Sequence, residues 1–528
     1  MKSKNSNAES EYDFIIIGSG FGGSVSALRL AEKGYKVLVL EKGRRLEAED
    51  FPATNWNLKK WLWIPIFKFY GLFKITLFNH VTTLSGVGVG GGSLVYANTL
   101  PIPKEKFFTS GTWANLDDWE TELKPHYDTA LRMLGASKNP RLEIGDLALK
   151  ELGKRLKKEN LFEPTDAAVF FGDPGKEYED PYFNGAGPKR NGCNFCGGCM
   201  TGCRFNAKNT LDKNYLYFAQ KLGAKIQPES EVTNVIPLGN NNNGGYKVVW
   251  KSSTSFLSRK QSIYSKGIIF SGGVLGTVKL LLKLKKTSLP NLSDMVGKNI
   301  LTNSESLIGV TTFDKSKTFS DGIAIGSILH TDEDTHLEPV RYGSGSGFWR
   351  LLMSPMVVGN NIISRVLNIV LDIIKHPLQN FKVFTVWNWA SRTQILLFMQ
   401  TINSKLQFVH NTFGLKSTLQ EGESPTAFIP GAQALAKEYA KIVNGKPMVL
   451  LTETLFGAPT TAHILGGAVM GKDKNEGVID KYNKVFGYKN MYVCDGSMIS
   501  SNPGVNPSLS ITAISERAMS KITTKKNF

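Results

Sequence analysis

The chain has 528 residues, of which 41% are hydrophobic and 20% are charged. This length exceeds what one hydrophobic core usually supports, and the composition excludes a disordered chain, so we expect a globular protein of more than one domain. The net charge of +18 would attract polyanions, but no motif accompanies it that predicts a specific nucleic-acid partner. The first residues lack the apolar stretch of a secretory signal, and no apolar run is long enough to span a bilayer. The sequence therefore predicts a cytoplasmic protein, with peripheral contact to a membrane left open.

The first forty residues have the pattern of a βαβ unit. Residues 12–17 form a continuous β-branched run typical of a strand buried on both faces. Residues 24–33 carry apolar side chains at helical spacing up to Gly34, and a second apolar run follows at 37–40. Two strands joined by a helix in this way predict a parallel sheet.

A dinucleotide-binding fingerprint lies at the junction of the first strand and its helix. Gly18, Gly20 and Gly23 form G-x-G-x-x-G, in which the glycines allow the tight turn, the approach of a pyrophosphate and close helix packing. The phosphates would lie at the helix N-terminus, and Glu41 ends the second strand where a carboxylate can accept hydrogen bonds from a ribose. The fingerprint alone does not choose between FAD and NAD.

Later segments repeat the α/β signals. We expect a strand at 266–270 with a helix at 277–285, and a second pair at 491–493 and 507–522. The two ends of the chain are therefore expected to share one domain. The asparagine run at 240–243 predicts a hairpin tip or surface loop.

Two further blocks carry a resemblance to a known family. The Gly-rich segment 86–95 and the block from His463 to Asn506 resemble the glucose-methanol-choline (GMC) oxidoreductases, particularly their cholesterol oxidase branch. The likeness runs through most of the chain in order and is poor only over residues 315–450. It implies FAD as the cofactor and hydride transfer from an alcohol carbon to flavin N5. The substrate is expected to be a hydrophobic alcohol such as a sterol or a lipid, as in steroid metabolism.

The resemblance also implies the fold and the domain limits. The fold class is α/β: an FAD-binding Rossmann-like domain with a parallel sheet built from both chain ends, and a substrate domain of mixed β-sheet plus helices. Residues 1–110, 190–310 and 451–528 are assigned to the FAD-binding part, the last with the catalytic block. Residues 111–189 and 311–450 are assigned to the substrate or cap domain.

Cofactor contacts follow from the matched positions. Gly90, Gly91 and Ser93 are expected to lie against the flavin and its pyrophosphate, since glycine leaves the backbone open to close approach. Further along, the backbone of Val232 would hold the adenine edge, and Asp495 with Gly496 would hold the ribityl chain. Asp495 could instead be a helix cap.

His463 and Asn506 are the expected catalytic residues. An imidazole titrates near neutrality, so His463 can take the hydroxyl proton as the hydride leaves, or orient the hydroxyl. The amide of Asn506 would polarise the substrate oxygen or the flavin edge without titrating. Each also has a structural alternative, a core histidine and a turn asparagine before a proline.

Two positions depart from the cholesterol oxidase pattern. Tyr96 stands where those enzymes have asparagine, and we find no counterpart of their active-site glutamate in the 380–420 region. Steroid double-bond isomerisation is therefore not expected. Glu305 is a spare acid that could approach the site.

Cys193, Cys196, Cys199 and Cys203 have the C-x2-C-x2-C-x3-C spacing of ferredoxin ligands. Three readings compete: a 4Fe-4S cluster, a zinc site, or reduced thiols packed in a Gly-rich loop. A cluster would favour one-electron transfer to a separate electron acceptor, and so a dehydrogenase over an oxidase.

Two segments suggest a membrane surface. Residues 56–78 mix aromatic and lysine side chains, and residues 348–374 are largely apolar, although core packing explains either equally well. They support a second hypothesis, a membrane-surface flavin and iron-sulfur electron-relay protein. An NAD-linked reductase is a third, and a flavin absorption spectrum would separate it from the others.

Overall fold

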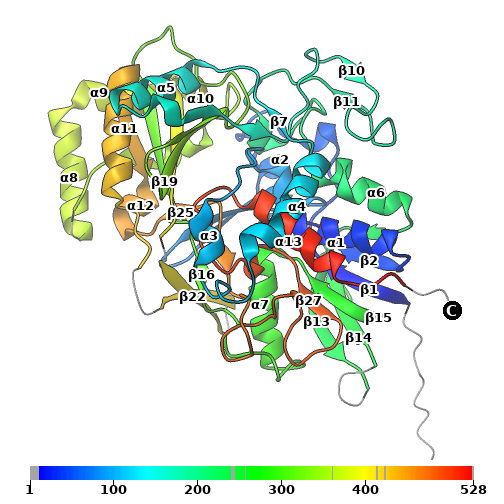
Figure 1. Cartoon of the computed structure of the whole chain (residues 1–528). Helices are drawn as coiled ribbons and strands as arrows, with labels where there is room; N and C mark the ends of the chain where they lie inside the picture. The colour runs from blue at the N-terminus through cyan, green and yellow to red at the C-terminus, as the bar shows by residue number, and fades with distance from the viewer. Residues whose placement is uncertain are drawn as a thin grey trace, which may run out of the picture.

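A computed structural model gives the fold of the chain (Figure 1). It describes residues 11–525 except 240–243, 256, 360, 403, 412–413 and 421–423, so the predicted loop at 240–243 lies outside the described residues. A mainly parallel sheet with its helices occupies the lower right of Figure 1, and an antiparallel sheet with other helices occupies the upper left.

The first sheet has the strand order β12-β2-β1-β15-β14-β13, and β27 also pairs with β15. Its strands are β1 (Tyr12–Ile17), β2 (Val37–Leu40), β12 (Lys225–Gln227), β13 (Ser230–Pro237), β14 (Tyr246–Ser252), β15 (Gln261–Phe270) and β27 (Met491–Val493). The pairs that involve β1, β2, β12 and β27 are parallel, and the pairs β13–β14 and β14–β15 are antiparallel. Every residue of β1 and β2 is buried, as their continuous apolar sequences predict.

Helices from both ends of the chain cover this sheet. α1 (Phe21–Glu32) packs against α13 (Ser508–Ser520), which also packs against α4 (Trp119–Leu134), and α6 (Tyr215–Lys221) packs against α1. Glu516 joins three of these helices, because its carboxylate accepts hydrogen bonds from Arg29 and from the hydroxyl of Tyr215. The predicted Rossmann-like domain built from both chain ends is confirmed. The domain limits stay a prediction.

The second sheet is antiparallel, in the order β20-β24-β17-β21-β19-β18-β8. Its strands are β8 (Phe162–Pro164), β17 (Ser306–Thr312), β18 (Ser327–His330), β19 (Thr335–Val340), β20 (Met353–Pro355), β21 (Thr393–Gln400) and β24 (Gly445–Leu450). α5 (Ile144–Arg155) and α11 (Pro430–Val443) pack on it. Arg341 donates to Asp146 at 2.8 Å in a fully buried ion pair that ties α5 to the strand end beyond β19.

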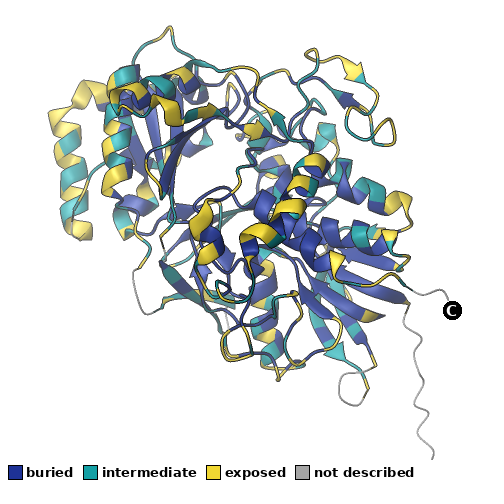
Figure 2. Cartoon of the chain, viewed as in Figure 1, coloured by how far each residue is buried: buried dark blue, intermediate teal, exposed yellow. Residues whose placement is uncertain are grey.

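The two segments for which membrane contact and core packing were considered differ in the structure. Residues 56–78 fold into short elements around the buried Trp61, which stacks on Phe73 at a ring distance of 5.0 Å. Residues 348–374 end in α8 (Ile362–Lys375), which is exposed along its outer side (Figure 2). No helix in the described part of the chain is both long and apolar enough to cross a membrane.

Candidate active site

One cavity of about 690 Å³ is lined by residues of both sheets. The residues predicted to bind a cofactor or to act in catalysis that line it are Gly18, Gly20, Glu41, Gly91, Val232, His463, Asp495, Gly496 and Asn506. Sequence segments more than 400 residues apart thus meet at one site. Gly23, Gly90 and Ser93 are not part of the lining.

The three fingerprint glycines do different work. A Cβ on Gly18 would meet Ser271 O at 2.3 Å, and a Cβ on Gly23 would meet Gly18 O at 2.2 Å, so these two glycines permit close packing of the turn. Gly20 is the N-cap of α1, and a Cβ there would meet nothing within 4 Å. The backbone at Gly20 therefore faces open space at the positive end of a helix, which is where an anionic pyrophosphate is stabilised.

Glu41 ends β2 beside this turn. Its Oε2 accepts hydrogen bonds from Ser19 N at 2.9 Å and Ser19 Oγ at 2.7 Å, and its Oε1 accepts one from Gly43 N at 2.7 Å. The carboxylate is thus fixed in the cavity wall by the loops on either side of it, with lone pairs left for a ligand hydroxyl.

The Gly-rich loop lies against the fingerprint. Gly91 has φ of +53°, and a Cβ on it would meet the Cα of Gly20 at 2.7 Å, so only glycine fits. Ser93 is fully buried, where its Oγ donates to Gly90 O at 2.7 Å and accepts from Leu211 N at 3.1 Å. Gly91 thus borders the cavity, and Ser93 supports the loop from behind.

Asp495 is a helix cap that borders the cavity. Its Oδ1 accepts from Ser497 N at 2.8 Å as a helix cap, and its Oδ2 accepts from Thr277 Oγ1 at 2.5 Å. Burial raises the pKa of Asp495 against the lowering effect of these hydrogen bonds. The side chain is therefore a cap that also borders the cavity, beside Gly496.

His463 is held by a buried carboxylate. Its Nδ1 lies 2.5 Å from Glu305 Oε1, and Glu305 Oε2 accepts from Ala462 N at 2.9 Å. Asn303 and Ser304 precede Glu305 with φ of +57° and +44°, an uncommon turn that brings this acid to the histidine. Burial favours the neutral imidazole, but the charge and hydrogen bond of Glu305 outweigh it, so the pKa of His463 is raised.

Asn506 is held by a second buried acid. Its Nδ2 donates to Glu338 Oε2 at 3.3 Å, while its Oδ1 has no hydrogen-bond partner among the described residues. Glu338 lies on β19, fully buried, with its Oε1 3.4 Å from His336 Nε2. Glu338 was not predicted, because a counterpart of the active-site glutamate was expected at 380–420. The sequence feature that could have indicated it is an acidic residue within the strand sequence Thr335–Val340.

The rest of the cavity is lined largely by apolar side chains. They come from the antiparallel sheet and from the segments that pack on it, and they include Phe73, Leu307, Ile325, Val340, Trp349, Met353, Ile395, Leu397 and Leu450. This part can take up a large apolar molecule, and the side chains of His463 and Asn506 are among the polar groups that line the same cavity.

Comparisons with known proteins agree with this geometry. Family models described as GMC oxidoreductase match residues 184–303 and 425–515, and one described as NAD(P)-binding Rossmann-like domain matches residues 16–53. A cholesterol oxidase of Acinetobacter baumannii is 46% identical, over 98% of this chain and 95% of that protein. A cholesterol oxidase of Mycobacterium tuberculosis is 42% identical, over 97% of this chain and 91% of that protein. The chain belongs to the GMC oxidoreductase family.

More distant relatives show the same fold. A long-chain-alcohol oxidase of Arabidopsis thaliana is 24% identical to this GMC oxidoreductase, and the match covers 97% of this chain and 67% of the Arabidopsis protein. The solved structure of a pyridoxine 4-oxidase from Mesorbium loti superposes with a TM-score of 0.61 at 13% identity, covering 96% of this chain and 98% of that one. The predicted family is confirmed, and with it an FAD-dependent alcohol oxidoreductase.

The backbone and the charges of the cavity in this GMC oxidoreductase fit FAD. Besides the open space at Gly20, a Cβ on Gly273 would meet nothing within 4 Å, so the backbone is open to a ligand on a second side. Five lysines line the same cavity against three acids: Lys42, Lys74, Lys251, Lys279 and Lys283, with Glu41, Glu231 and Asp495. Burial and the charges of Lys42 and Lys279 lower the pKa of Lys74 to about 8. Such a surplus of positive charge suits an anionic cofactor.

The cysteine segment of this GMC oxidoreductase had three possible roles. Among the described residues no group of three or more His, Cys, Asp or Glu side chains is placed to hold a metal ion, so a 4Fe-4S site at Cys193, Cys196, Cys199 and Cys203 is not supported. Burial raises the pKa of Cys193, and that of Cys199 to about 11, so both are thiols in the metal-free protein.

Backbone hydrogen bonds join this segment to several neighbouring segments. Cys193 N donates to Phe170 O at 3.0 Å, while Gly197 N donates to Gly322 O at 2.8 Å. The segment is thus bonded to different neighbours along its length, and Cys193 packs in an apolar cluster with Ala167 and Val169. The reading as packed thiols fits this arrangement. The electron-relay hypothesis is not supported, because it relied on the cluster.

Proposed function

We propose that this protein oxidises the hydroxyl group of a sterol-like alcohol to a carbonyl. The observation that supports this most is the continuity of one cavity from the fingerprint, past His463 and Asn506, to the apolar lining. FAD would supply the hydride acceptor. The cholesterol oxidases at 42–46% identity support a sterol as the substrate.

His463 is proposed as the proton acceptor. The contact of Nδ1 with Glu305 favours the tautomer that carries its proton on Nδ1, which leaves the Nε2 lone pair for the substrate hydroxyl. Removal of the hydroxyl proton leaves an electron pair that forms the carbonyl bond as the hydride departs from carbon. Glu305 then stabilises the imidazolium, because the positive charge forms beside a buried carboxylate.

Asn506 is proposed to position the substrate oxygen. Glu338 holds its amide from one side, and Oδ1 and the second Nδ2 proton remain for a ligand. Asn506 also directly precedes Pro507 at the N-terminus of α13, whose partial positive charge stabilises negative charge that develops nearby.

Anaerobic single-turnover reduction of the bound flavin tests these roles. His463→Asn and Asn506→Leu should keep FAD and slow reduction by a sterol at least ~10²-fold, as expected for the loss of acid-base or electrostatic assistance. His410→Asn is the matched control, since His410 lies on β22 (Lys405–Asn411) outside the cavity lining. Wild-type rates in both site variants would exclude these residues from the chemistry.

The substrate class is tested with the same assay. A sterol should reduce the flavin with kcat/KM at least ~10²-fold above that of 2-propanol, because the apolar lining adds binding energy only for the larger molecule. Equal values for the two alcohols would contradict the sterol proposal and leave the alcohol oxidoreductase itself intact.

A further inference from the structure

The outermost helix of the antiparallel part, α8, exposes its apolar side. Ile363, Leu367, Val370 and Ile374 have relative exposures of 77%, 55%, 46% and 67% and recur at helical spacing, so they share one face. In Figure 2 this helix lies at the edge of the molecule, largely in the colours of exposed and half-buried residues. An ordinary surface helix turns such a face toward the core.

Three polar side chains of α8 bond to the rest of the protein instead. Arg365 Nη2 donates to Leu455 O at 3.1 Å, and Asn368 Nδ2 donates to Val358 O at 2.7 Å. Asp372 pairs with Lys446 Nζ at 2.5 Å. The helix is therefore anchored by polar contacts in an orientation that leaves its apolar face outward.

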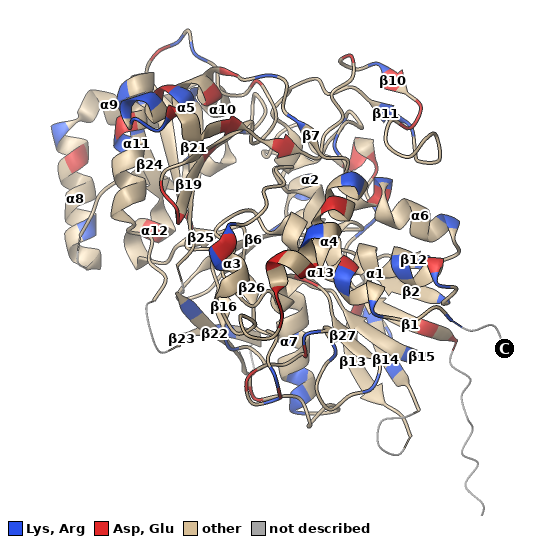
Figure 3. Cartoon of the chain, viewed as in Figure 1, with Lys and Arg blue, Asp and Glu red and all other residues tan. Residues whose placement is uncertain are grey.

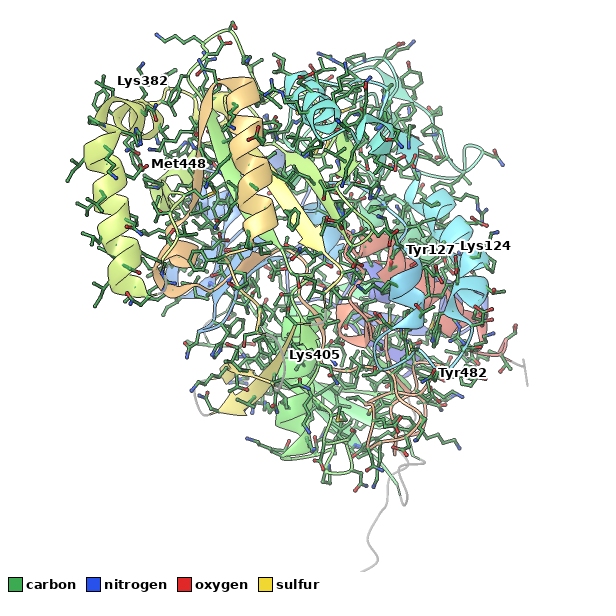
Figure 4. The ribbon with its side chains drawn as sticks, turned by 60° about the vertical axis from the view of Figure 1, so that its left-hand side comes forward. Lys124, Tyr127, Lys382, Lys405, Met448 and Tyr482 are labelled. Atoms are coloured by element: carbon green, nitrogen blue, oxygen red, sulfur yellow. The ribbon has the colours of Figure 1, made fainter. Side chains whose placement is uncertain are left out.

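The exposed face continues into α9 (Pro377–Thr385) and the residues after it. Leu378, Phe381 and Trp387 are 74%, 67% and 93% exposed. Lys375 and Lys382 are also exposed, whereas the negative charge of Asp372 is paired internally. Figure 3 shows few charges on α8, and Figure 4 shows side chains projecting outward from these helices, with Lys382 labelled. The face is thus apolar with a basic fringe.

The elements against which α8 packs adjoin the apolar part of the cavity. α8 packs against β20 and against α12 (Leu451–Phe456), in which Leu451 and Phe456 are exposed. Leu450 lines the cavity directly before Leu451. The exposed Leu351 and Leu352 lie in the same way between the cavity residues Trp349 and Met353. In the two segments next to α8, exposed apolar residues are therefore adjacent in sequence to residues of the cavity wall.

We propose that the outward face of α8 and α9 docks the protein on a phospholipid surface, with the apolar side chains among the acyl chains and Lys375 and Lys382 at the lipid phosphates. Apolar residues on one side of a helix with lysines at its margin are typical of such interfacial helices. A second copy of the chain fits less well, because a symmetric dimer would bring the same lysines together. The inference rests on the proposed function only in that a lipid-soluble substrate would enter from this surface.

Sterol-free vesicles test the docking independently of catalysis. Holoenzyme is sedimented with vesicles of phosphatidylcholine and phosphatidylglycerol, and the bound fraction is measured against lipid concentration. Wild type should bind, and Leu367→Glu with Val370→Glu should lower the partition coefficient roughly 100-fold, about tenfold for each apolar side chain lost from the bilayer. Leu222→Glu with Leu257→Glu is the control, since both are exposed leucines outside α8 and α9, and it should bind like wild type.

Flavin reduction by a detergent-solubilised sterol should be unchanged in both double variants, which separates docking from the site chemistry. Failure of the wild type to sediment would overturn the proposal. Equal sedimentation of the α8 variant and the wild type would also overturn it. A wild-type dimer in size-exclusion chromatography that the α8 variant converts to a monomer would assign this face to a second copy instead.

Discussion

Gly20→Val separates cofactor binding from folding. The backbone at Gly20 has φ of −70° and ψ of −168°, which valine adopts, and its Cβ would meet no protein atom within 4 Å. The substitution should therefore leave the apoprotein folded. The branched side chain would instead occupy the space in which a pyrophosphate contacts the N-terminus of α1.

The size of the effect follows from the contacts that would be lost. A hydrogen bond between a backbone N–H and a charged phosphate oxygen contributes about 1.5–3 kcal/mol. Loss of two such bonds costs about 3–6 kcal/mol, which weakens FAD binding roughly 10²- to 10⁴-fold. Gly18→Val differs, since its Cβ would meet Ser271 O at 2.3 Å in a residue with φ of +103°.

Isothermal titration of FAD into apoprotein, with thermal unfolding of the same samples, checks both parts. Gly20→Val apoprotein should melt within about 2 °C of wild-type apoprotein, since surface changes away from packed features cost within about 0.5 kcal/mol. Gly18→Val apoprotein should melt at a clearly lower temperature. Wild-type affinity for FAD in Gly20→Val would refute the placement of the pyrophosphate at Gly20. A folding defect as large as that of Gly18→Val would refute the claim that a side chain at Gly20 meets no protein atom.

Three other outcomes are expected. Glu305→Gln removes the charge that raises the pKa of His463, so the acidic limb of the kcat/KM profile, which reports deprotonation of this base, should move to lower pH; an unmoved limb would mean that another group titrates. Leu397→Trp fills part of the apolar lining and should raise KM for a sterol at least ~10-fold while leaving reduction by 2-propanol nearly unchanged, and an equal effect on both would argue for a general folding defect. Anaerobically purified protein should contain no stoichiometric iron or labile sulfide, and Cys196→Ser should keep wild-type flavin reduction; about four irons per chain would reinstate the cluster.

The sequence was most informative where the signal is local. β1, β2 and β27 have the bounds expected from their apolar runs. α1 begins at Phe21 and not at 24, because the helix starts directly after the N-cap Gly20. α7 (Gly273–Lys285) begins earlier than the expected 277 for a similar reason, at the glycine pair that follows β15.

Non-local contacts account for what was missed. The middle of β19, residues 336–339, alternates polar and apolar residues, which is typical of a strand with one solvent face. Yet β18 and β21 flank β19, and every one of its residues is buried. Glu338 is consequently an interior acid, a fact that depends on the whole sheet. The cysteine spacing likewise contains no information on the backbone hydrogen bonds that join this segment to Phe170 and Gly322.

The pairing of β27 with β15, and of α13 with α1, bears on how the protein is made. The segment that completes the sheet follows β1 by roughly 470 residues, and at about 5–20 residues per second the ribosome needs about 25–95 s to reach it. During that interval α1 lacks the helix that covers it, and its apolar side chains are open to solvent or to a chaperone. Flavin capture therefore waits for residues 495–506, because the cavity wall at Asp495 and Asn506 does not exist before they have emerged.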